Sequence, residues 1–154
     1  MSRLSLICEN DVCSLVPQNN IEIKITDVYD GDTFTFVHLF HNIPISLNLR
    51  LFGVNAPERR NQVASKETSL EKQAGILVGN HVRSLICNKI LKCSITDWDK
   101  YGGRVLGTIE FQHDGNTMDL SEYLISKRFV KRYDGKKKDS YTDEELRYII
   151  EHCK

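Results

Sequence analysis

The sequence lacks the features that mark a membrane, secreted or disulfide-bonded protein. No window of its 154 residues is apolar enough to approach a membrane span. The apolar stretch from Leu4 to Cys8 ends at Glu9, which is too short for the core of a secretion signal. The cysteines form an odd set without CxxC spacing: Cys8, Cys13, Cys87, Cys93 and Cys153. We therefore expect an intracellular protein with reduced thiols, and neither a disulfide framework nor a zinc site.

Several catalytic signatures are also missing. The five histidines show no HxxxH or mixed Cys/His spacing, no Ser/His/Asp arrangement has a supporting motif, and no glycine-rich nucleotide loop is present. The formal net charge is zero, so total charge does not indicate a polyanionic partner. Forty per cent hydrophobic and 27% charged residues in a chain of this length are typical of one globular domain with a substantial core.

Hydrophobic periodicity predicts an α+β fold. Alternating apolar residues predict five short strands, at 21–28, around Phe34 and Phe36, at 47–51, at 90–98 and at 104–112. Helical spacing predicts a helix over 69–87, a short helix ending near 127 and a last helix that begins at a capping box on Thr142. Five strands with a helix after the third fit a five-stranded OB-type Greek-key barrel, a fold that binds nucleic acid across one face.

The domain prediction is simple. Residues 1–20 show no clear periodicity, and we interpret them as an N-terminal leader outside the main fold. Residues 21–154 form the predicted barrel domain. We expect a monomer without membrane association.

Polar residues gather where the predicted strands end. Asp30-Gly31-Asp32-Thr33 follows the first strand, and the third strand runs through Arg50 into Asn55-Ala56-Pro57-Glu58. A later turn presents Asp99-Lys100-Tyr101-Gly102-Gly103-Arg104. Acidic and amide oxygens can hold a hard cation, and arginines can bind an anionic phosphate. This combination favours metal-assisted attack on a phosphodiester.

Taken in this order over roughly residues 21 to 138, these motifs resemble the thermonuclease family, which has the staphylococcal-nuclease-like fold. The resemblance implies a hydrolase: a metal-dependent endonuclease that cleaves DNA and RNA with little sequence preference and leaves 3′-phosphates. It also implies Ca²⁺ as the cofactor.

The resemblance assigns a role to each site residue. Asp32 matches the first ligand aspartate, and Ala56 stands where a main-chain carbonyl ligates the metal. Asn55 replaces a second ligand aspartate, so a different divalent cation could be preferred, because an amide oxygen lacks the charge. Glu58 matches the general base. Arg50 and Arg104 match the two arginines that hold the phosphate. The substrate contacts are matched by Lys100, Tyr101 and Tyr133.

Each assignment has an alternative. Asp32 could be a turn residue that bonds its own backbone, Glu58 a solvent-exposed loop glutamate, and Arg50 a partner in an ion pair with either acid. Tyr133 could stack on a base or pack at the barrel rim. The lysines and arginines over 127–138 could follow a phosphate backbone or form a solvated face. For the whole chain, the alternative is a non-catalytic OB-fold module that binds nucleic acid or protein.

Overall fold

The structure, a computed structural model, describes residues 16–59, 68–100 and 102–154. Its elements, in chain order, are β1 (Gln18–Val28), β2 (Thr33–Phe40), β3 (Ile43–Leu51), β4 (Val54–Asn55), α1 (Thr68–Ile86), β5 (Ile90–Trp98), β6 (Val105–His113), β7 (Asn116–Asp119), α2 (Leu120–Ser126), β8 (Lys131–Arg132) and α3 (Asp143–His152). Strand β1 begins three residues before the predicted domain start at residue 21, and residues 1–15 of the predicted leader lie outside the described part.

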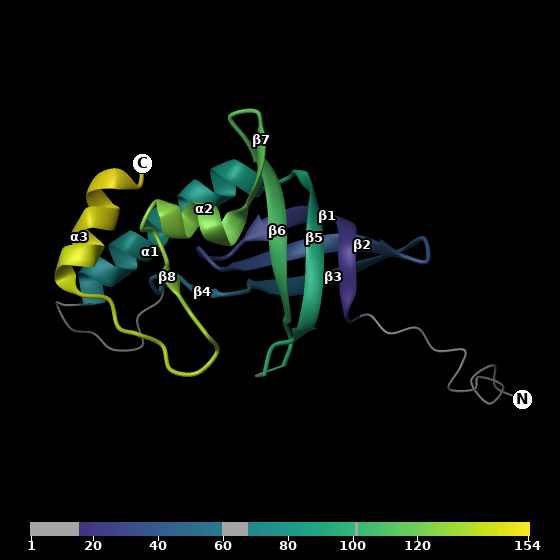
Figure 1. Cartoon of the computed structure of the whole chain (residues 1–154), viewed down its shortest axis with the longest axis horizontal. Coiled ribbons are helices and arrows are strands. Elements are labelled where there is room, and N and C mark those ends of the chain that lie inside the picture. Colours follow the sequence, from purple (N-terminus) through teal and green to yellow (C-terminus); the bar gives the residue numbers. More distant parts are fainter. Residues whose placement is uncertain (1–15, 60–67, 101) are drawn as a thin grey trace, which may run out of the picture.

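Five strands form the predicted closed barrel. They are hydrogen-bonded in the order β3-β2-β1-β5-β6, and the parallel pairing of β3 with β6 closes the cylinder. Figure 1 shows helices α1, α2 and α3 gathered at one end of this barrel. The predicted OB-type α+β fold is confirmed. Within the described ranges, no helix has the length and apolar character to cross a membrane.

Apolar residues that alternate along the strands form the barrel core, and a row of apolar residues on α1 covers one end of it. Ile23, Ile25, Phe34 and Phe36 point inward and are fully buried, as the period-two pattern predicts. On α1 the buried hydrophobic residues recur every four positions, and they are Ala74, Val78, Val82 and Ile86. This helix lies against α3, so the barrel end opposite the β2–β3 hairpin is covered by helices (Figure 1).

Strand register brings the three polar motifs to one place. Thr33 pairs with Arg50 across β2 and β3, so Asp32 lies beside that arginine. Leu49 pairs with Val105 across the closing β3–β6 contact, which places Arg104 next to the same strand end. Barrel closure therefore assembles residues that are more than 70 positions apart in the sequence.

Two glycines on α1 have different surroundings. A Cβ added at Gly75 would lie 2.7 Å from the carbonyl oxygen of Pro57 and 2.8 Å from that of Glu58, whereas a Cβ at Gly79 would come no closer than 3.4 Å to Asp30. By helix propensity alone, the two glycines would be equally unfavourable. The structure shows that Gly75 lets α1 support the backbone that carries Glu58.

We expect Gly75→Ala to lower the free energy of unfolding by about 1–3 kcal/mol, because backbone atoms cannot move aside for the methyl group. Gly79→Ala is the matched control, and it should be neutral or stabilise the protein by up to about 1 kcal/mol through helix propensity. Urea unfolding of both variants measures the difference. Equal effects of the two substitutions would show that α1 does not press on the Pro57–Glu58 backbone.

Candidate functional site

Two carboxylates, the half-buried Asp30 and the buried Asp32, stand at the turn between β1 and β2. The backbone N–H of Asp32 donates to Oδ1 of Asp30 at 3.1 Å, which fixes the turn. Burial and the neighbouring charge of Asp32 raise the pKa of Asp30 to about 7. Asp32 is only 4% exposed, and its Oδ2 accepts the backbone N–H of Ala56 at 3.0 Å. The acid pair is thus tied directly to the loop that follows β3.

Arg50 is the buried partner of this acid pair. Its Nη1 donates to Oδ1 of Asp32 at 3.2 Å, and the residue is 8% exposed. Its guanidinium carbon lies 5.6 Å from the centre of the Tyr133 ring. The ion pair with Asp32, one of the alternatives from the sequence, is therefore present, and it orients Arg50 at the end of β3.

Arg104 reaches the same place from β6. Its Nε and Nη2 both donate to Oδ2 of Asp99, at 2.9 and 2.5 Å, and its Nη1 lies 3.4 Å from the Thr33 hydroxyl. The preceding turn contains two glycines with φ near +70°, a conformation that glycine adopts without steric cost. Asp99 is buried and holds the guanidinium in place, a role that the sequence reasoning did not assign.

Glu58 faces the site from the loop after β4. Its backbone N–H donates to Oε1 of Glu71 on α1 at 3.3 Å. Its carboxylate Oε1 accepts from Nζ of Lys138 at 2.9 Å, and both side chains are about half exposed. The sequence reasoning placed Lys138 only within a basic run, because nothing local shows that it crosses to Glu58.

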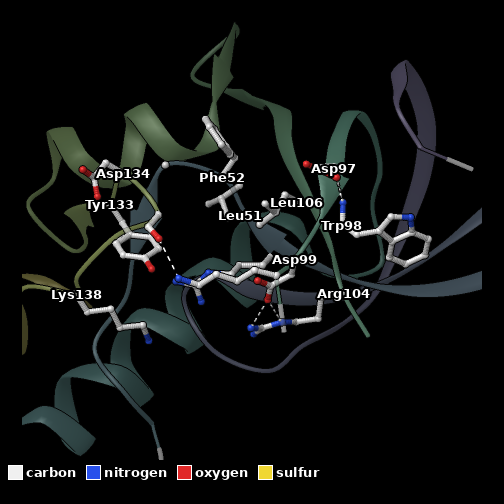
Figure 2. A pocket seen from close by; sticks show the side chains of 14 residues that line it. Leu51, Phe52, Asp97, Trp98, Asp99, Arg104, Leu106, Tyr133, Asp134 and Lys138 are labelled. Atoms are coloured by element: carbon white, nitrogen blue, oxygen red, sulfur yellow. Dashed lines mark hydrogen bonds and ion pairs between the residues drawn. The ribbon is translucent and has the colours of Figure 1, made fainter. Parts of the chain in front are cut away.

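Two adjoining cavities contain these groups. The first, of about 260 Å³, is lined by Tyr29, Asp30, Asp32, Thr33, Arg50, Ala56, Glu58, Arg104 and Lys138. The second, of about 270 Å³, is lined by Arg50, Leu51, Phe52, Gly53, Asp97, Trp98, Asp99, Lys100, Arg104, Leu106, Tyr133, Asp134, Gly135 and Lys138. Figure 2 shows Tyr133 and Lys138 entering the second cavity from one side and Asp99 with Arg104 from the other. Of the residues that the structure describes, only the three cations Arg50, Arg104 and Lys138 line both cavities.

The remaining predicted residues differ from one another in their positions. Lys100 lines the second cavity, and its Nζ donates to the carbonyl of Gly135 at 3.0 Å. Tyr101 lies outside the described residues. Asn55 is buried, does not line the first cavity, and its amide oxygen has no hydrogen-bond partner within the described part of the chain.

Most of the basic run has structural partners. Lys131 pairs with Glu145 at 2.8 Å, and Arg132 with Glu122 at 2.8 Å. The Arg128 guanidinium lies 4.5 Å from the centre of the Tyr148 ring. These contacts stabilise the joints between α2, β8 and α3. They favour a structural role for this part of the run over contact with a phosphate backbone.

The oxygen donors offer a partial fit to a divalent cation. Asp30 and Asp32 are close enough for one charge to raise the pKa of the other, a repulsion that a cation relieves. The unpartnered Asn55 oxygen lies next in sequence to Ala56, which lines the cavity. Among the described residues, no group of three or more His, Cys, Asp or Glu side chains is placed to hold a metal ion. A cation here therefore depends on amide and main-chain oxygens as well as on the acids.

No protein-family model matches the chain, and no curated protein matches it either. Function is therefore inferred from the motifs and from the geometry of the two cavities.

The arrangement has a clear chemical character. Three cations converge on a space that also contains a carboxylate pair and a half-exposed glutamate. Such a space suits a phosphate group flanked by a base. The neighbouring cavity, which the Tyr133 ring enters, suits the flat ring of a nucleobase.

Proposed function

We propose that the protein is a cation-dependent nuclease that hydrolyses phosphodiester bonds of DNA or RNA. One observation carries the proposal: Asp32, Arg50, Glu58 and Arg104, from three separate sequence motifs, line a single cavity. A fold that only binds nucleic acid has no need for a carboxylate base beside two phosphate-binding arginines. Membership of the thermonuclease family is part of the same proposal.

The chain's own residues supply most of the chemistry. Glu58 accepts a proton from the attacking water, whose oxygen forms the new bond to phosphorus. Arg50 and Arg104 donate to the phosphate oxygens, on which charge grows in the transition state. The bond to the 5′ oxygen breaks, that oxygen takes a proton from solvent, and a 3′-phosphate remains. A divalent cation near Asp32, Asn55 and Ala56 would neutralise part of the phosphate charge.

The same geometry accounts for the expected low sequence preference. The cations bind the backbone phosphate, which every nucleotide shares. The Tyr133 ring in the second cavity can stack on any base. Lys100 and Tyr133 line this cavity and are the proposed substrate contacts there.

A non-catalytic binding module is the second candidate. It is favoured by the ion pairs that Arg104 and Glu58 already make with Asp99 and Lys138, since residues with structural partners can be retained for stability alone. Incubation of the purified protein with single-stranded DNA, in Ca²⁺, Mg²⁺, Mn²⁺ or EDTA, separates the two. Cleavage that requires a cation supports the nuclease. Stoichiometric binding with intact DNA in every cation supports the module.

Asn55→Asp should tighten Ca²⁺ binding by about tenfold or more, because it adds a negative charge to the proposed ligand set. The side chain is buried, so without a cation the new carboxylate should also lower the free energy of unfolding, by about 1–3 kcal/mol. Calorimetric titration and thermal unfolding, each with and without EDTA, measure both effects. Asn116→Asp, in the exposed β6–β7 hairpin, is the control. Unchanged Ca²⁺ affinity would show that Asn55 does not face the cation.

A further inference from the structure

Lys138 occupies a position that its neighbours in the basic run do not share. It lines both cavities, together with the two arginines, and its ammonium group lies 2.9 Å from the Glu58 carboxylate. Lys136 instead faces Asp134 at 3.9 Å, and Lys137 lines a separate surface hollow and neither of the two cavities. One lysine of the run therefore enters the site, while the adjacent one points elsewhere.

The segment that carries Lys138 is held over the site by several contacts. The short β4–β8 pairing and the bond from Tyr133 N–H to the Gly53 carbonyl, at 2.9 Å, fix its start. Lys100 donates to the carbonyl of Gly135, and the N–H of Lys136 donates to the Asp134 side chain at 3.0 Å. The capping box on Thr142 fixes the following helix. The reach of Lys138 to Glu58 is thus built into the fold.

We propose that Lys138 is a third phosphate-binding cation, and that its ion pair with Glu58 is a clasp that the substrate phosphate opens. A half-exposed ion pair is weak, so a phosphate held by Arg50 and Arg104 can draw the ammonium away from the carboxylate. The phosphate contact does not depend on catalysis. The role of the clasp rests on the proposed function. When phosphate opens the ion pair, Glu58 becomes free to accept the proton of water, so the base is active only when phosphate is present.

Binding without catalysis tests the phosphate contact. We would titrate a fluorescein-labelled single-stranded octanucleotide in EDTA, at several salt concentrations, into wild type, Lys138→Met and the matched control Lys137→Met. Lys138→Met should bind about fivefold more weakly, with a salt slope lower by about 0.7, the value for one lost contact with a single strand. Lys137→Met should resemble wild type, and Lys138→Arg should restore most of the affinity. Equal affinities and slopes for the two methionine variants would overturn the proposal.

A double-mutant cycle tests the clasp. Glu58→Gln should release Lys138 and tighten octanucleotide binding by about two- to fivefold, the size expected when a half-exposed pair no longer competes. Adding Glu58→Gln to Lys138→Met should give a clearly smaller gain. Equal gains in both backgrounds would overturn the clasp. Because these measurements use EDTA, their failure is distinguishable from failure of the nuclease proposal, which is read from cleavage.

Discussion

Replacing Arg50 with lysine is expected to lower the rate of DNA cleavage at saturating substrate by about 100-fold or more. A guanidinium offers a planar fork of donors, so it can bind Asp32 and a phosphate oxygen at once, whereas an ammonium concentrates its charge at one point. The loss should fall mainly on kcat, because the contact strengthens as charge builds on the phosphate. Steady-state cleavage of a labelled oligonucleotide measures it.

Lysine is preferred to alanine here because Arg50 is buried against Asp32. Removing the positive charge would leave a buried carboxylate unpaired, at a cost of about 3–5 kcal/mol of stability, and loss of the fold would be confused with loss of catalysis. Arg132→Lys, at an exposed pair with Glu122, is the matched control. Parent-rate cleavage by Arg50→Lys would remove Arg50 from the proposed mechanism.

Glu58→Gln is expected to reduce kcat by about 100-fold or more, the usual contribution of a positioned general base. The amide keeps the shape of the side chain but cannot accept the proton of water at neutral pH. Substrate affinity should not fall, since a negative charge leaves the phosphate site. The ratio of kcat to KM effects therefore separates this variant from one that merely disturbs binding.

The control for Glu58 is Glu151→Gln, an exposed position on α3 that lines neither of the two cavities. Thermal unfolding should show both variants folded, because the Glu58 carboxylate is about half exposed. If Glu58→Gln cleaves as fast as Glu151→Gln, another group must accept the proton.

Much of the fold was predictable because its signals are local. The alternation of apolar residues along β1 and β2 predicts inward-facing positions such as Ile23 and Phe34, which are buried. The capping box that begins α3 at Thr142 can also be recognised in the sequence. Arg104 lies 3.4 Å from the Thr33 hydroxyl because the β3–β6 pairing brings the two strand ends together. The candidate site residues could be grouped from the sequence because they follow strands whose ends the barrel topology brings together.

The remaining features depend on contacts between distant segments. The pairing of Asn55 with Lys131 joins two strands of only two residues each, too short for any periodicity. Lys138 reaches Glu58 across 80 positions, and the steric role of Gly75 depends on which backbone faces it. Asp99, to which the sequence reasoning assigned no role, did have a usable signal: it is an acid placed across a tight glycine turn from Arg104.

The central claim is that this cavity cleaves phosphodiesters with the help of a cation. The most direct test is single-turnover cleavage of a 5′-labelled single-stranded oligonucleotide, with enzyme in excess, by wild type and by Glu58→Gln from matched preparations, each in Ca²⁺ and in EDTA. We expect cleavage by wild type in Ca²⁺ only, with 3′-phosphate ends identified by mass spectrometry. Intact oligonucleotide bound to the wild-type protein in Ca²⁺, or identical products from both proteins, would contradict the account.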